Sequence, residues 1–110
     1  MCLRFPMLFR VGQGHSMTVA DLNGDRTADL VTANGGSNDV SVLLGHGDGT
    51  FTAELRFVVG VGSRPQSVAV GDLNGDITPD LVTADGRFSA VTILLGRGDG
   101  TFVKLQLGPP

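Results

Sequence analysis

Residues 21–51 read DLNGDRTADLVTANGGSNDVSVLLGHGDGTF, and residues 72–102 read DLNGDITPDLVTADGRFSAVTILLGRGDGTF. The two stretches align without a gap at an offset of 51 residues, and 21 of the 31 aligned residues are identical. Self-similarity at a fixed period of this length indicates a repeat architecture, in which each unit buries an apolar face against its neighbour. The chain is therefore predicted to contain two copies of one structural unit.

The composition favours short strands over helices. Glycine accounts for 17 of the 110 residues, and 41% of the chain is apolar, with six phenylalanines but no tryptophan or tyrosine. So many glycines imply many tight turns, and no stretch shows the 3.6-residue apolar period of an amphipathic helix. We expect an all-β fold with a core of valine, leucine and phenylalanine.

Each unit is predicted to contain four antiparallel strands, because apolar runs alternate with turn residues. The predicted strands are 16–20, 29–33, 40–44 and 51 to about 59 in the first unit, and 67–70, 80–84, 91–95 and 102–107 in the second. A turn of sequence Gly-x-Gly-Asp-Gly-Thr-Phe leads into the fourth strand of both units, and its Asp-Gly pair suits the positive φ angles of a hairpin. The loops 34–39 and 85–90 differ between the units, so a ligand would be sought there.

Residues 67–84, SVAVGDLNGDITPDLVTA, followed by VTILLGRGDGTF, resemble the FG-GAP or VCBS-type repeat. This is the blade family of integrin α-chain propellers and of many bacterial extracellular proteins. The resemblance extends over nearly the whole chain, twice. It implies β-propeller blades with calcium in the loop between their first two strands. It also implies roles in adhesion, recognition or scaffolding at the cell surface or outside the cell, and seldom catalysis by the repeats themselves.

Two blades of four antiparallel strands are too few for a closed propeller, which needs about four to eight blades. Within the single segment 1–110, the first repeat is predicted to span about 12–59 and the second about 63–107. Residues 3–9 are expected to form a strand that pairs with another blade. Exposed apolar blade faces are unfavourable. We therefore expect either a homo-oligomeric ring of three or four chains or the remaining blades of a longer chain. Phe51, Phe102 and the leucine pairs 43–44 and 94–95 are expected to pack between blades.

Each repeat carries an Asp-x-Asn-x-Asp-x-x-x-Asp loop whose chemistry suits calcium. Calcium takes six to eight hard oxygen ligands in flexible geometry. A tight loop turns the side chains at positions 1, 3 and 5 towards one point, position 9 can close the shell, and the main-chain carbonyl at position 7 can add an oxygen. The candidate ligands are Asp21, Asn23, Asp25, Thr27 and Asp29 in the first loop, and Asp72, Asn74, Asp76, Thr78 and Asp80 in the second. We predict about two Ca²⁺ ions per chain.

Other interpretations of these loops fit less well. Neither loop contains cysteine or histidine, which argues against zinc and copper, and magnesium prefers to keep its water ligands. Ordinary Asx turns with solvated carboxylates would explain one such loop. The pattern occurs twice, however, with all four side-chain positions retained.

The loops depart from the resembled family at position 6, where glycine is usual and this chain has Arg26 and Ile77. A positive φ costs a non-glycine residue about 1–2 kcal/mol, so we expect the loops to turn at Gly24 and Gly75 instead. Calcium affinity is then expected in the range of extracellular modules, with a dissociation constant of about 10⁻⁴ to 10⁻³ M.

The charge and the cysteine content exclude several classes of partner and structure. The net charge is −3, from 11 acidic and 8 basic residues, which argues against a nucleic-acid or anionic-membrane partner. Two bound divalent cations would change the net charge from −3 to about +1. No run is long enough to insert across a bilayer, and residues 1–11 lack the apolar core and cleavage site of a signal peptide. Cys2 is the single cysteine, so no intrachain disulfide forms.

Several short motifs have simpler structural explanations. Residues 97–99 spell Arg-Gly-Asp, an integrin-recognition tripeptide, but the first repeat has His-Gly-Asp in the same turn, and the turn alone accounts for the glycine and aspartate. The glycine-rich turns precede strands rather than helices, so they do not resemble phosphate-binding loops. His15 and His46 are replaced in the second repeat, and no serine lies in a nucleophile elbow. We therefore expect no enzyme activity.

The leading hypothesis is a calcium-binding β-propeller module for recognition or adhesion, with a protein or glycan ligand. Two alternatives stay open. One is a structural blade pair, natural or engineered, that self-assembles without a ligand. The other is a carbohydrate-binding or lyase-type propeller.

Overall fold

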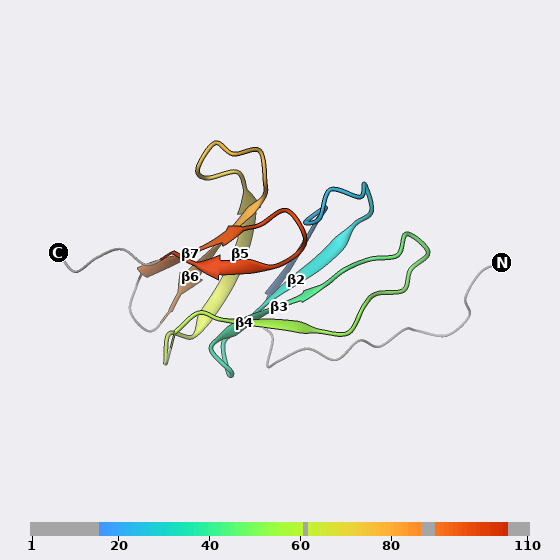
Figure 1. Cartoon of the computed structure of the whole chain (residues 1–110). Coiled ribbons are helices and arrows are strands. Elements are labelled where there is room, and N and C mark those ends of the chain that lie inside the picture. The colour runs from blue at the N-terminus through green and yellow to red at the C-terminus, as the bar shows by residue number, and fades with distance from the viewer. Residues whose placement is uncertain (1–15, 61, 87–89, 106–110) are drawn as a thin grey trace.

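The computed structural model describes residues 16–60, 62–86 and 90–105 (Figure 1). These residues form two four-stranded sheets, each antiparallel with its strands in sequence order, and none of them is helical. The all-β prediction with four strands per unit is confirmed. The predicted N-terminal strand at 3–9 lies outside the described residues.

Each sheet falls within one of the two predicted repeats. The first sheet consists of β1 (Ser16–Ala20), β2 (Asp29–Asn34), β3 (Asp39–Leu43) and β4 (Leu55–Val58). The second sheet consists of β5 (Pro65–Gly71), β6 (Asp80–Asp85), β7 (Ala90–Gly96) and β8 (Phe102–Lys104). The central strands form where β-branched residues and leucines are concentrated. Four strands, β2, β5, β6 and β7, end at Asn, Gly or Asp, which favour turns.

The fourth strand of the first sheet begins later than predicted. The expected start at Phe51 is wrong, because β4 begins at Leu55 and Phe51 forms only an isolated bridge with Gly45. Next to that bridge, Thr52 donates its main-chain N–H to the Leu44 carbonyl, while its side-chain Oγ1 accepts the Leu44 N–H. A side-chain oxygen thus replaces a carbonyl in the ladder, and regular pairing resumes only after this point.

The two sheets pack face to face. Residues directly opposite one another in an antiparallel pair point to the same side of the sheet. Val31 pairs with Val42, and Ala33 pairs with Val40, so these four side chains share one face of the first sheet, and all are fully buried. The residues of the second sheet that join the same core are Val68, Val70, Leu81 and Leu94. We call this contact between the sheets the joint.

Two further contacts extend the joint. The rings of Phe57 on β4 and Phe102 on β8 meet edge to face, with centroids 5.7 Å apart and an interplanar angle of 79°. Leu44 lies against Gly100, where a Cβ atom would stand 2.9 Å from the leucine Cδ atoms. Phe102, Leu44 and Leu94 therefore pack between the sheets as predicted. The prediction is wrong for Leu43, which pairs with Leu30 and so points to the other side of its sheet.

The acidic loops follow β1 and β5, and both project from the same edge of the sheet pair, at the top of Figure 1. The turn between β2 and β3 lies at the opposite edge. The repeat thus presents its candidate metal loops on one side of the molecule.

Candidate metal centre

Strand pairing brings the two ends of each acidic loop together. β1 ends at Ala20 and β2 begins at Asp29, and these two residues are partners in the ladder. Gly71 and Asp80 are partners in the same way at the second loop. The last pair of the ladder therefore holds loop positions 1 and 9 close to one another.

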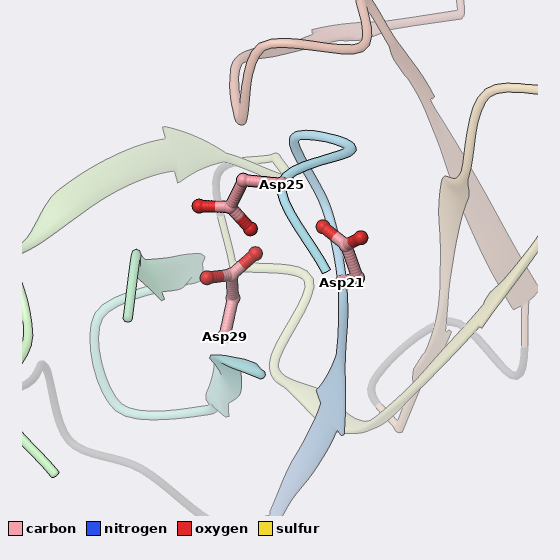
Figure 2. Close-up of side chains that lie close together, drawn as sticks. All are labelled: Asp21, Asp25 and Asp29. Atoms are coloured by element: carbon pink, nitrogen blue, oxygen red, sulfur yellow. The ribbon is translucent and has the colours of Figure 1, made fainter. Parts of the chain in front are cut away.

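Three carboxylates converge in each loop. Asp21, Asp25 and Asp29 each place one carboxylate oxygen within 4.8 Å of the others, and Figure 2 shows the three side chains gathered around one point. The second loop has the same arrangement, formed by Asp72, Asp76 and Asp80. Three negative charges at this spacing repel one another unless a cation or hydrogen-bond donors compensate them.

The aspartate at position 1 organises the loop backbone. Asp21 Oδ1 accepts the N–H groups of Asn23 at 3.2 Å and Gly24 at 2.8 Å, and its Oδ2 accepts the N–H of Arg26 at 2.9 Å. In the second loop, Asp72 accepts the N–H groups of the residues at positions 4, 5 and 6. These bonds curl the loop around its first carboxylate.

The aspartate at position 9 is fully buried and ties the loop to the sheet. Asp29 Oδ2 accepts the N–H of Leu22 at 2.7 Å, and its Oδ1 accepts the N–H of Gly45 at 2.7 Å. Asp80 makes the same two bonds, to the N–H groups of Leu73 at 2.9 Å and Gly96 at 2.8 Å. A buried carboxylate needs such partners. The two bonds make position 9 a structural clamp, a role that the sequence analysis missed.

Gly45 and Gly96 are required for this clamp. A Cβ atom at Gly45 would lie 2.1 Å from the Ala28 carbonyl oxygen, and one at Gly96 would lie 2.0 Å from the Pro79 carbonyl oxygen. Only glycine lets the chain after the third strand approach the end of the acidic loop so closely. Glycine occurs at both of these corresponding positions of the repeat, and this was the sequence signal from which the clamp could have been predicted.

The aspartate at position 5 is exposed and bonded mainly to the threonine at position 7. Asp25 Oδ1 accepts the main-chain N–H of Thr27 at 3.0 Å and its hydroxyl at 2.7 Å. These bonds lower the pKa of the Asp25 carboxyl below its ordinary value, the hydroxyl bond contributing most, and Thr78 lowers the pKa of Asp76 in the same way. The lowered pKa favours the ionised form of both carboxylates, which is the form that binds a cation.

The asparagine at position 3 differs between the two loops. In the first loop, the Oδ1 atom of Asn23 is buried and has no hydrogen-bond partner among the described residues. Asn74 in the second loop is exposed. A buried amide oxygen without a partner costs about 1–3 kcal/mol. Its carbonyl oxygen, like the carboxylates of the same loop, is of the donor type that a calcium ion binds. The donor set therefore fits Ca²⁺. The carbonyl at position 7, on Thr27 and Thr78, stays a prediction.

A family model described as an FG-GAP-like repeat matches residues 21–83, which is more than half of the chain and includes both acidic loops. The chain belongs to the FG-GAP-like repeat family. No curated protein and no solved structure matches it. FG-GAP-like repeats are typically non-enzymatic, β-propeller-type modules of extracellular proteins. Within the described part of the chain, no helix is long and apolar enough to span a bilayer.

The FG-GAP-like loops of this chain turn through a strained residue at position 6. Arg26 has φ 66° and Ile77 has φ 73°, and the glycines at position 4 also have positive φ. The expectation that Gly24 and Gly75 would spare position 6 is therefore wrong. The physical reason is that the N–H at position 6 must point back to the first aspartate, where it donates at 2.9 Å in both loops. Ile77 accepts this conformation while 90% exposed.

The Arg-Gly-Asp tripeptide lies in a turn that explains it without a ligand. Asp99 Oδ1 accepts the main-chain N–H of Thr101 at 2.9 Å and its hydroxyl at 2.5 Å, and Gly98 has φ 84°. Asp48 and Thr50 form the same turn in the first repeat. His46 is exposed beside that turn, and His15 lies outside the described residues.

Proposed function

We propose that this FG-GAP-like chain is a calcium-binding β-propeller module that acts in recognition outside the cell. The observation that carries the proposal is the convergence of three carboxylates in each acidic loop, the first of which also contains the unpartnered, buried Oδ1 of Asn23. All four groups are hard oxygen donors, which suit Ca²⁺ rather than zinc or copper. The extracellular setting rests on the family, whose repeats are typical of extracellular proteins.

In this proposal the ion bridges the two ends of the acidic loop. Asp21 follows the end of β1 and Asp29 opens β2, so one ion bound by both would fix the corner between these strands. Asp25 and Asn23 would supply further oxygens from the turn itself. Bound calcium supplies positive charge and rigidity here, and the loops at the same edge of the sheets become firm enough to present a surface to a protein or glycan partner.

Calcium titration by isothermal calorimetry, with the chain in metal-free buffer, tests this function. We expect two ions per chain. Asp25→Asn and Asp76→Asn should each remove one ion, because each deletes a carboxylate charge while Thr27 or Thr78 can still donate to the remaining oxygen. Asp48→Asn is the matched control, since Asp48 makes the same bonds to a threonine outside the acidic loop.

The control variant should keep both ions. An absence of saturable calcium binding by the unaltered chain at millimolar calcium would refute the proposal. Equal losses in Asp25→Asn and Asp48→Asn would refute the assignment of the site.

A further inference from the structure

The outer faces of the two sheets repeat the two halves of the joint. Corresponding residues of the repeats differ by 51 positions. The three valines and the alanine of the first sheet that form the joint correspond to residues on the far side of the second sheet, which we call the second outer face: Val82, Ala84, Val91 and Ile93. The residues that the second sheet contributes to the joint correspond to a strip on the far side of the first sheet, which we call the first outer face: Met17, Val19, Leu30 and Leu43.

Exposure differs sharply at several corresponding positions, although Leu43 is buried like its counterpart Leu94. Val40 is 0% exposed in the joint, whereas its counterpart Val91 is 66% exposed. On the first outer face, Met17 is 63% and Val19 is 56% exposed, whereas their counterparts in the joint pack against the core. The second outer face is therefore apolar, and the first carries Thr32 and Ser41 beside its apolar residues. Each has the same kinds of side chain as a face that is buried within the chain.

The second outer face is hollowed where the joint is filled. A hollow of about 570 Å³ lies beside Val91, lined by Gln66, Ala84, Asp85, Gly86, Ala90 and Val91. Ala33, Gly35 and Val40, which correspond to Ala84, Gly86 and Val91, are all buried in the first sheet. A surface that a second sheet covers in one repeat is thus open in the other.

The contact between Leu44 and Gly100 can also recur. Gly49 corresponds to Gly100, and nothing lies within 4 Å of the position that a Cβ atom of Gly49 would take. Leu95 corresponds to Leu44 and is half-buried. A Leu95 side chain from one molecule therefore fits over Gly49 of another, as Leu44 fits over Gly100 within the chain.

We propose that the second outer face of one copy of this chain binds the first outer face of another copy, head to tail. The partner is a second copy because each outer face finds its complement in the other face of the same chain, in the arrangement that the joint already has. Pairing of two identical faces would instead set Val91 against Val91, a contact with no counterpart in the joint. Head-to-tail contacts close into a ring when the rotation allows, and three or four copies would give six or eight blades.

The mass of the full chain in solution, measured by light scattering over a concentration series, tests the proposal. We expect masses of several chains for the unaltered protein. Met17→Lys blocks only the first outer face, and Val91→Lys blocks only the second, so each variant alone should remain at the monomer mass of 11.4 kDa. Mixed in equal amounts, the two variants should form a dimer, because each retains the face that the other lacks.

The matched control is Ile77→Lys, which places a lysine at an exposed apolar residue away from both outer faces. Its counterpart Arg26 is exposed, so a neighbouring copy would not cover this position, and the control should associate like the unaltered chain. Circular dichroism checks that all variants are folded. The proposal is overturned if the unaltered chain stays monomeric to millimolar concentration, which leaves these faces to further blades of a longer chain. It is also overturned if the mixture of variants stays monomeric.

Discussion

Leu22 and Leu73 hold the same position in the two acidic loops, yet Leu22 is 1% exposed and Leu73 is 49% exposed. Their local bonds are the same, because each donates its N–H to the buried aspartate at position 9. The difference comes from the second sheet, which packs against the core that includes Leu22. The repeat sequence therefore determines the shape of each loop, while the neighbouring sheet determines how far the loop is buried.

The largest expected difference between the repeats concerns the aspartates at position 9. Asp29→Ala removes the acceptor of two buried N–H groups and should lower the free energy of unfolding by about 2–5 kcal/mol. Asp80→Ala should lower it by about 1–2 kcal/mol, because its two bonds are only partly buried and water can replace them. Urea unfolding of both variants in metal-free buffer measures the difference. Equal losses would contradict the comparison.

A smaller difference is expected for corresponding valines on the two sheets. Val40→Ala deletes two methyl groups from the joint and should cost about 2 kcal/mol of stability. Val91→Ala changes an exposed residue and should cost less than about 0.5 kcal/mol. Thermal unfolding at low protein concentration, where copies do not associate, separates the two. A large loss in Val91→Ala under these conditions would mean that the second outer face is covered within the single chain.

Relief of backbone strain should produce a still smaller effect, with the opposite sign. Ile77→Gly should stabilise the chain by about 1 kcal/mol, because a β-branched residue at φ 73° is strained and its exposed side chain is not needed for packing. Arg26→Gly should stabilise it less, since arginine is not β-branched. Melting temperatures of both variants measure the effect. Destabilisation by Ile77→Gly would show that the Ile77 side chain has a packing role.

The smallest effect is expected in the two Asp-Gly turns, where the repeats should behave alike. Hydrogen bonds from Thr50 and Thr101, the hydroxyl bonds contributing most, hold the pKa of Asp48 and Asp99 below the ordinary value of 3.8. Their stabilisation is therefore present above pH 3.8 and is lost as the pH falls through the lower pKa of the folded state. Thr50→Val and Thr101→Val should each raise the pKa of the neighbouring carboxyl. Carboxyl NMR titration measures both shifts, and a clear difference between the turns would show that they are not equivalent.

Much of this fold follows from the repeat alone. The 51-residue offset, the glycine-rich turns and the apolar runs identified two four-stranded units and placed the central strands to within one or two residues. The start of β4 did not follow, because the side chain of Thr52 competes for the Leu44 N–H. Such competition depends on where two segments meet in space, which a sequence pattern does not contain.

The acidic loops were predictable in their convergence but not in their internal bonds. The spacing of Asp21, Asp25 and Asp29 indicated one centre, and their carboxylate oxygens do gather there. The clamp from Asp29 to Gly45 joins residues 16 positions apart, so no local pattern reveals it. The positive φ of Arg26 was misjudged because side-chain preference was weighed without the N–H that the Asp21 carboxylate holds in place.

A calcium titration followed by amide NMR tests the central claim most directly, because it reports the two loops separately. We predict that amide resonances of both loops shift and saturate, and that residues 21–29 saturate at lower calcium than residues 72–80. The unpartnered Oδ1 of Asn23 is already buried in the first loop, whereas the exposed Asn74 must be ordered on binding. Unshifted resonances in both loops would contradict the calcium sites. Saturation of the second loop first would contradict the prediction that the loop packed against the second sheet binds calcium more tightly.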